Sequence, residues 1–254
     1  MGKLDGKVAI ITGASGGIGR VAAVLFAGEG AKVVVASRNI EAGQETVRII
    51  EEAGGEAIFI RTDVSQAEDL AKMVRATVDT YGSLDVLYNN AGIVHEPAST
   101  VDIKVEEWEK TIAIYLTGSW LGMKFAIPEM IKAGGGSIIN TASPAAQVGV
   151  PNQIAYSATK GGIISMSRVA AVEYAAKGIR VNCIAPGPIA TPLLMGFFGE
   201  EGTRYLAGLN PRGQLGKMEE VAQLALFLAP DGSPHIIGQT LAVDGGHTID
   251  SHIR

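Results

Sequence analysis

The sequence predicts an α/β fold in which helices cover both faces of a doubly wound parallel sheet, a three-layer α/β/α arrangement in a single domain. Two observations carry this prediction. Short apolar runs alternate with amphipathic stretches along the 254 residues, at a spacing typical of βαβ units. Runs such as residues 33–35 are apolar throughout, which indicates strands that are buried on both faces.

The predicted elements follow in order along the chain. Each predicted strand is a short, mainly apolar run: 8–12, 32–36, 57–60, 85–88, 137–140, 180–185 and 240–243. Each predicted helix carries apolar residues at helical spacing: 17–28, 39–53, 67–81, 105–133, 155–176 and 218–228. Residues 192–211 indicate a long irregular loop, which we interpret as a mobile substrate-binding flap inside one domain spanning residues 1–254.

Composition narrows the possible functions. The net charge of −5 comes with no basic cluster, so a nucleic-acid partner is not expected. No uncharged apolar run approaches the ~18 residues of a membrane span, and no signal core opens the chain, so we expect no membrane partner and a cytoplasmic location. The single cysteine, Cys183, cannot form an internal disulfide and is expected to be a small buried residue on a strand.

The histidines do not indicate a metal site. Their positions lack the spacing of metal ligands, so we expect surface roles for all four and no metal. These residues are His95, His235, His247 and His252.

A glycine cluster joins the first predicted strand to the first predicted helix. Gly13, Gly17 and Gly19 stand in the pattern G-x-x-x-G-x-G, with Ser15 and Ile18 between them. Glycine allows the backbone to approach a pyrophosphate closely, and the helix N-terminus presents N–H groups and a positive dipole end to that anion. A plain turn is the alternative, but the position between a strand and a helix favours a dinucleotide site of the Rossmann type.

The end of the second predicted strand bears on the choice of dinucleotide. An acidic residue in this region would bond the ribose hydroxyls of NAD(H), but the sequence has Ser37 and Arg38 there. A guanidinium can bind a 2′-phosphate bidentately. The sequence therefore favours NADP(H), with NAD(H) possible; the alternative is an arginine on a solvated loop.

A candidate catalytic group stands at the start of the helix predicted over 155–176. Tyr156 and Lys160 are four residues apart and so share one helix face. A cation beside a tyrosine favours the phenolate and lowers its pKa, which would make Tyr156 a usable general acid or base. Ser143, just after a predicted strand, could bond the substrate oxygen. Lys160 could also hold the cofactor ribose.

These pieces together resemble the short-chain dehydrogenase/reductase family, in its compact branch of about 250 residues, over residues 5–246. The resemblance implies an oxidoreductase that acts on alcohols or ketones and commonly forms homotetramers. It implies that Asp63 bonds the adenine amine, with Val64 beside it, and that the segment 89–92 lines the adenosine side. It implies that the segment 186–191 bonds the nicotinamide carboxamide, Ile189 through its backbone. The further cofactor residues implied are Asn90, Ala91, Gly92, Pro186, Gly187, Ile189 and Thr191.

The sequence departs from the family pattern at two positions. Tyr115 stands where the family usually has an asparagine, a position that in the family helps to hold a water linking the lysine to solvent. The backbone carbonyl of residue 115 could still serve. The second departure is Pro144, directly after the predicted catalytic serine, where it would reshape the pocket wall.

The leading functional prediction is hydride transfer between NADP(H) and a largely apolar ketone or secondary alcohol. The apolar residues of 192–211, such as Leu193, Met195 and Phe197, could contact this substrate or pack on the enzyme's own body. Two alternatives stay open: a 3-oxoacyl thioester reductase, and a catalytically weak dinucleotide-binding protein.

Overall fold

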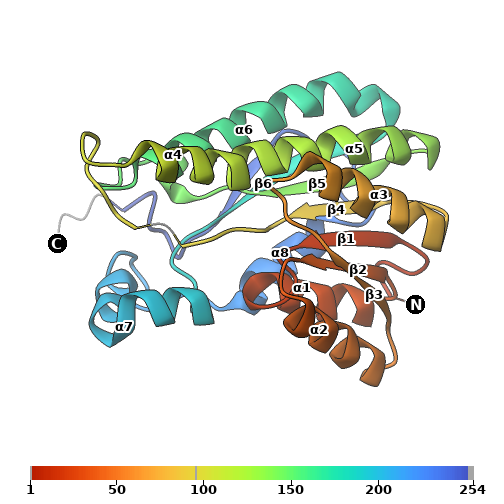
Figure 1. Cartoon of the computed structure of the whole chain (residues 1–254), viewed down its shortest axis with the longest axis horizontal. Helices are drawn as coiled ribbons and strands as arrows, with labels where there is room; N and C mark the ends of the chain where they lie inside the picture. The colour runs from red at the N-terminus through yellow and green to blue at the C-terminus, as the bar shows by residue number, and fades with distance from the viewer. Residues whose placement is uncertain (1, 95, 251–254) are drawn as a thin grey trace.

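The computed structural model describes residues 2–94 and 96–250. Within them, seven parallel strands form one sheet in the order β3-β2-β1-β4-β5-β6-β7 (Figure 1). The order reverses beside β1, so β1 and β4 form the topological switch point, outside whose carboxyl ends such sheets bind ligands. The strands are β1 Val8–Thr12, β2 Lys32–Ser37, β3 Glu56–Arg61, β4 Val86–Asn89, β5 Gly136–Thr141, β6 Ile179–Pro186 and β7 Thr240–Val243.

Helices cover both faces of the sheet, which confirms the predicted three-layer, doubly wound fold (Figure 1). One face is covered by α1 Gly17–Gly28, α2 Ile40–Glu52 and α8 Met218–Leu228. The other is covered by α3 Ala67–Tyr81, α5 Gly118–Lys132 and α6 Ile154–Tyr174. The remaining elements are α4 Val105–Thr111, η1 Ile112–Thr117, η2 Pro144–Ala146, η3 Ala175–Lys177 and α7 Pro192–Ala207.

Alternating strand residues feed the two core layers. Ile11 of β1 packs in the cluster beneath α1 and α8, whereas its neighbour Ile10 packs in the cluster beneath α3 and α5. Both side chains are fully buried, and each such burial stabilises the fold by roughly 1.5–3 kcal/mol. Cys183 of β6 is buried as predicted.

The helix predicted over 105–133 is continuous but not regular. Its middle turn, η1, is a π-helix that separates α4 from α5. A π-turn adds a residue to the helical repeat and is often found at functional sites. Periodicity alone could not show it, because one extra residue barely disturbs the apolar pattern of so long a helix.

The prediction of an irregular loop over 192–211 was wrong. Most of the segment is α7, with Thr191 as its N-cap: the Thr191 side chain accepts a hydrogen bond from the N–H of Leu194 at 3.1 Å. Pro192 occupies the first helical turn, a position where its missing N–H costs nothing. Gly199 (φ 61°, ψ −169°) kinks the helix. The glycines and prolines that indicated a loop therefore begin and bend a helix.

Several surface predictions can be placed. His235 is exposed and His247 half-buried, while His95 and His252 lie outside the described residues. No cluster of His, Cys, Asp or Glu side chains that could hold a metal ion occurs in the described part of the chain. Across residues 2–94 and 96–250, no helix is both long enough and apolar enough to cross a bilayer.

The outer face of α5 and α6 bears on assembly. Trp120, Val169 and Val172 are exposed there. Of the small residues of α6, Gly162 packs internally, since a Cβ on it would lie 2.9 Å from Leu116, whereas a Cβ on Gly161 would meet nothing within 4 Å. The homotetramer stays a prediction.

Candidate active site

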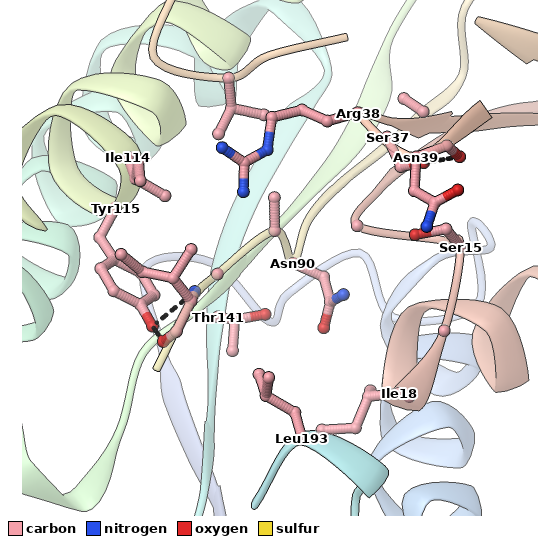
Figure 2. A pocket seen from close by; sticks show the side chains of 18 of the residues that line it. Ser15, Ile18, Ser37, Arg38, Asn39, Asn90, Ile114, Tyr115, Thr141 and Leu193 are labelled. Atoms are coloured by element: carbon pink, nitrogen blue, oxygen red, sulfur yellow. Dashed lines mark hydrogen bonds between the residues drawn. The ribbon is translucent and has the colours of Figure 1, made fainter. Parts of the chain in front are cut away.

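A cleft of about 580 Å³ opens where β1, β2, β4 and β5 end (Figure 2). Its position is the one expected at the switch point of a doubly wound sheet. Fourteen of the sequence-predicted site residues line it: Gly13, Ser15, Gly17, Ile18, Ser37, Arg38, Asp63, Val64, Asn90, Ala91, Gly92, Tyr156, Lys160 and Thr191.

The glycine-rich turn forms one wall of the cleft. Gly13 and Gly17 have φ of +71° and +54°, which glycine adopts without steric cost. The guanidinium of Arg20 holds the turn from behind, donating to the carbonyl of Ser15 at 2.6 Å and to that of Ala42 at 3.0 Å. No side chain caps the N-terminus of α1, which leaves its first N–H groups available to an anion.

Gly19 lies where α1 packs closely against the end of β1. It does not line the cleft. A Cβ at this position would lie 2.4 Å from the carbonyl oxygen of Gly13 and 2.7 Å from the Asn90 side-chain nitrogen. The glycine is therefore needed for α1 to approach the end of β1.

Arg38 reaches into the cleft from the end of β2 (Figure 2). Its guanidinium is more than half exposed and lies 3.9 Å from the carboxylate of Asp63. Burial would raise the pKa of Asp63, but hydrogen bonds from Ser65 and the positive charges of Arg38 and Arg61 outweigh it, so the pKa lies below its usual value. The Ser37 hydroxyl donates to the carbonyl of Asn39 at 3.1 Å.

The three predicted catalytic residues come from two elements. Ser143 follows β5 and caps η2, where its Oγ accepts a hydrogen bond from the N–H of Ala145 at 3.2 Å. Tyr156 and Lys160 stand one turn apart on α6, and the Ser143 side chain hydrogen-bonds to Tyr156. Pro144 occupies the first position of η2, where its fixed φ suits a helical start. This second departure from the family pattern therefore stands at the start of the short helical turn that Ser143 caps.

The electrostatics differ from the sequence prediction. Burial raises the pKa of Tyr156, and the hydrogen bond with Ser143 opposes the rise only in part. Burial also lowers the pKa of Lys160 to about 7. Its ammonium donates to the carbonyl of Thr141 at 2.6 Å. Burial, rather than a nearby cation, thus dominates the pKa of Tyr156.

Three other predicted cofactor residues, Pro186, Gly187 and Ile189, lie at the end of β6 and just after it. Gly187 donates its N–H to the carbonyl of Val243 at 3.0 Å, and a Cβ on it would lie 2.8 Å from Asp244. Ile189 is buried in the core, and Pro186 ends β6. None of these residues, nor Ser143 itself, is among those lining the cleft.

Ten further residues line the cleft. Leu193 and Pro192 belong to the segment expected to contact the substrate, Gly16 stands within the glycine motif, and Tyr115 gave a signal as a departure from the family pattern. The others have no motif of their own and were missed: Ala36, Asn39, Thr62, Ile93, Ile114 and Thr141.

Comparison with known proteins shows which sequences this chain resembles. The sequence model of a family described as enoyl-(acyl carrier protein) reductase matches residues 13–248. Cyclohexanol dehydrogenase of Acinetobacter sp. (strain SE19) is 41% identical, over 97% of this chain and 96% of that protein. Cis-4-hydroxycyclohexanecarboxylate dehydrogenase of Sinomonas cyclohexanicum is 41% identical, over 95% and 96% of the two chains.

A solved structure of a reductase has the same fold. Levodione reductase superposes with a TM-score of 0.94 at 31% identity, covering 96% of this chain and 98% of that one. The chain belongs to the short-chain dehydrogenase/reductase family. It is an oxidoreductase that acts on alcohols or ketones with a nicotinamide dinucleotide.

The buried Lys160 generates a prediction about stability. Its pKa of about 7 in the folded chain lies below the value of about 10.4 in an unfolded chain, so between these values the unfolded chain binds more protons and stability rises with pH. Relative to Lys160→Met, the wild type should gain about 2.7 kcal/mol between about pH 6 and about pH 9. Below this window the lysine is charged in both states and its full burial penalty remains.

Urea unfolding of both proteins across this pH range measures the effect. Because Lys160→Met keeps every other titrating group, the difference in unfolding free energy between the two proteins reports Lys160 alone. A difference in stability between the two proteins that stays flat with pH would contradict the assignment.

Proposed function

We propose that this chain interconverts alicyclic secondary alcohols and the corresponding ketones with NADP(H), using Tyr156 as the proton-exchanging group. The observation that carries the proposal is that Tyr156 and Lys160 line the same cleft as the glycine-rich turn, with the Ser143 side chain hydrogen-bonded to Tyr156. The substrate class is supported by two relatives, which are named for cyclohexanol and cis-4-hydroxycyclohexanecarboxylate.

The cleft residues fit a dinucleotide. The uncapped N-terminus of α1 suits a pyrophosphate, and a Cβ on Gly16 would meet no atom within 4 Å, so the space before the turn is open. Arg38 projects into the cleft with more than half of its side chain exposed, and can bind a 2′-phosphate. No carboxylate stands at position 37 to repel that phosphate. These features support NADP(H) over NAD(H).

Proton transfer falls to the three buried or half-buried side chains. When bound, the nicotinamide supplies or accepts the hydride. In the reduction of a ketone, the Tyr156 hydroxyl donates its proton to the substrate oxygen; in the oxidation of an alcohol it receives that proton. Burial raises the pKa of Tyr156, so at neutral pH the tyrosine is in the protonated form from which a proton can be donated. For the reverse direction, the charged form of Lys160 stabilises the phenolate.

Ser143 holds the substrate oxygen. Its Oγ already accepts from the Ala145 N–H, which fixes the side chain and leaves the hydroxyl proton to be donated. One hydrogen bond with the substrate oxygen and one from Tyr156 would then place the reacting carbon beside the cofactor.

The kinked helix α7 supports an apolar substrate. Leu193, Met195 and Phe197 are 56%, 49% and 42% exposed. The Phe197 ring packs edge to face against Phe198, but about half of each side chain is left to meet a substrate. Leu193 lines the cleft beside Ile18 (Figure 2). Arg212, which follows α7, forms an ion pair with Glu220 at 3.1 Å, so its charge is already matched by a carboxylate.

A panel of substrates tests the proposal. Cyclohexanol and cyclohexanone should be turned over with kcat/KM roughly 10-fold or more above 2-hexanol and 2-hexanone, because a pocket that fits a ring discriminates by about 1–3 kcal/mol. The panel includes a 3-oxoacyl thioester. A clear preference for the thioester would replace the proposal with a thioester reductase, and no turnover of any member would support a binding protein.

The role of Tyr156 is tested by Tyr156→Phe. Turnover should fall by about 10²–10⁴-fold because the proton donor is lost, while the affinity for the cofactor is retained because the ring remains. Tyr81→Phe is the matched control, since its buried hydroxyl on α3 lies outside the cleft lining. Retention of more than about a tenth of the rate in Tyr156→Phe would refute the assignment.

The choice of cofactor is tested at the end of β2. The wild type should show kcat/KM about 10- to 100-fold higher with NADPH than with NADH, the worth of a charge-assisted hydrogen bond. Ser37→Asp should reverse the preference by repelling the 2′-phosphate, and Arg38→Leu should abolish it. A wild type that prefers NADH would show that this reading of the strand end is wrong.

A further inference from the structure

Tyr115 joins two parts of the cleft that the sequence places far apart. It lies on the π-turn η1, which packs against α6, and only 7% of its surface is exposed. Figure 2 shows its ring in the cleft wall, with its hydroxyl directed at the chain that follows β4. A side chain buried in this place must find partners for its polar atom.

The first partner is the backbone of Ile93. The Tyr115 hydroxyl donates to the Ile93 carbonyl and accepts from the Ile93 N–H at 3.0 Å. The ring can come this close because residue 92 is glycine: a Cβ there would lie 2.8 Å from Cε1 of Tyr115. Since Gly92 and Ile93 both line the cleft, the phenol fixes one of its walls.

The second partner is the ammonium of Lys160. Its Nζ lies 4.3 Å from the centroid of the Tyr115 ring and 5.4 Å from that of Tyr156. The two rings meet edge to face, with centroids 5.4 Å apart and planes at 79°. The ammonium therefore lies against two aromatic rings, with the Thr141 carbonyl as its hydrogen-bond acceptor.

We propose that Tyr115 is a positioning residue of this active site, whose ring face holds the Lys160 ammonium and whose hydroxyl fixes the Gly92–Ile93 wall of the cofactor cleft. An asparagine, the usual residue of the family here, has no aromatic face to offer the ammonium. The effects on turnover and on NADPH affinity rest on the proposed function; the contacts with Lys160 and Ile93 do not.

The ring acts on the charge state of Lys160. A cation over an aromatic face is attracted to it, more strongly when both are shielded from water, so the ring opposes the lowering of the pKa by burial. The other groups facing the ammonium are Tyr156 on α6, Cys183 on β6, which also favours the charged form, and the Thr141 carbonyl on β5. Removing the ring should move the titration of Lys160 to lower pH.

Two variants separate the two contacts. Tyr115→Phe keeps the ring and removes the hydroxyl, so the Kd for NADPH, measured by fluorescence, should rise about 3- to 10-fold with the Lys160 titration unchanged. Tyr115→Leu removes both the ring and the hydroxyl. The Kd for NADPH should rise, and the pKa of Lys160 in the folded chain should fall by about one pH unit. Relative to the wild type, kcat should fall in Tyr115→Leu and stay near the wild-type value in Tyr115→Phe.

The Lys160 titration is read from urea unfolding, as the difference between each variant and the same variant carrying Lys160→Met. This readout needs no substrate, so it remains informative if the proposed function fails. Tyr81→Leu is the matched control, because it removes a ring that lies 5.3 Å from another lysine, Lys32, outside the cleft. Should Tyr115→Leu not fold, Tyr115→Met fills the site without an aromatic face.

The proposal is overturned if the Lys160 titration in Tyr115→Leu coincides with that of the wild type, or if Tyr81→Leu moves it equally. It is also overturned if Tyr115→Phe binds NADPH as tightly as the wild type does. A loss of stability alone, with neither change, would reduce Tyr115 to a packing residue.

Discussion

Lys160 carries an ammonium group into a site where only 3% of the residue is exposed, and the protein has to replace the water that it loses. A carbonyl oxygen of β5 at 2.6 Å and the faces of two tyrosine rings supply that replacement. These groups replace the lost water only in part, and as a result the pKa of Lys160 is lowered to about 7. A lysine with a pKa near 7 can gain or lose its proton near neutral pH. The groups packed around it determine whether the charged or the neutral form is favoured.

Those partners come together because the sheet is parallel. Thr141 ends β5, Ile93 follows β4 and the glycine turn follows β1, and the carboxyl ends of all three strands lie at one edge. Thr12 links two of these segments, since its Oγ1 accepts from the N–H groups of Asn90 and Ala91, both at 3.0 Å. Thr12 therefore connects the glycine-rich turn to the segment after β4, which the Tyr115 hydroxyl contacts at Ile93.

The two walls of the site differ in rigidity. The wall made by β4, β5 and α6 is tied by buried hydrogen bonds, such as that of Asn89 to Asn140 at 2.9 Å. The wall made by α7 has no buried residue and a kink at Gly199. Few buried contacts indicate low local stability. The residues proposed for proton transfer thus stand on the firmly packed side, whereas those proposed to contact the substrate stand on the side with few buried contacts.

The sequence by itself determined the fold class, the strand and helix succession to within a residue or two, and the motif residues Gly13, Gly17, Tyr156 and Lys160. Periodicity and motif spacing are local properties, so they can be read along the chain. The helical nature of 192–207 could not be read, because the same glycines and prolines that break helices also begin and kink them.

Only the tertiary structure decided what Tyr115 and Lys160 do to each other. Their partners Ile93 and Thr141 lie on other segments of the chain, 22 and 19 residues away, and no local pattern joins them. The sequence predicted a charged lysine that would lower the pKa of Tyr156, whereas burial raises that pKa and lowers that of the lysine. Desolvation depends on everything packed around a group, so it is decided when the sheet and its helices close over the site.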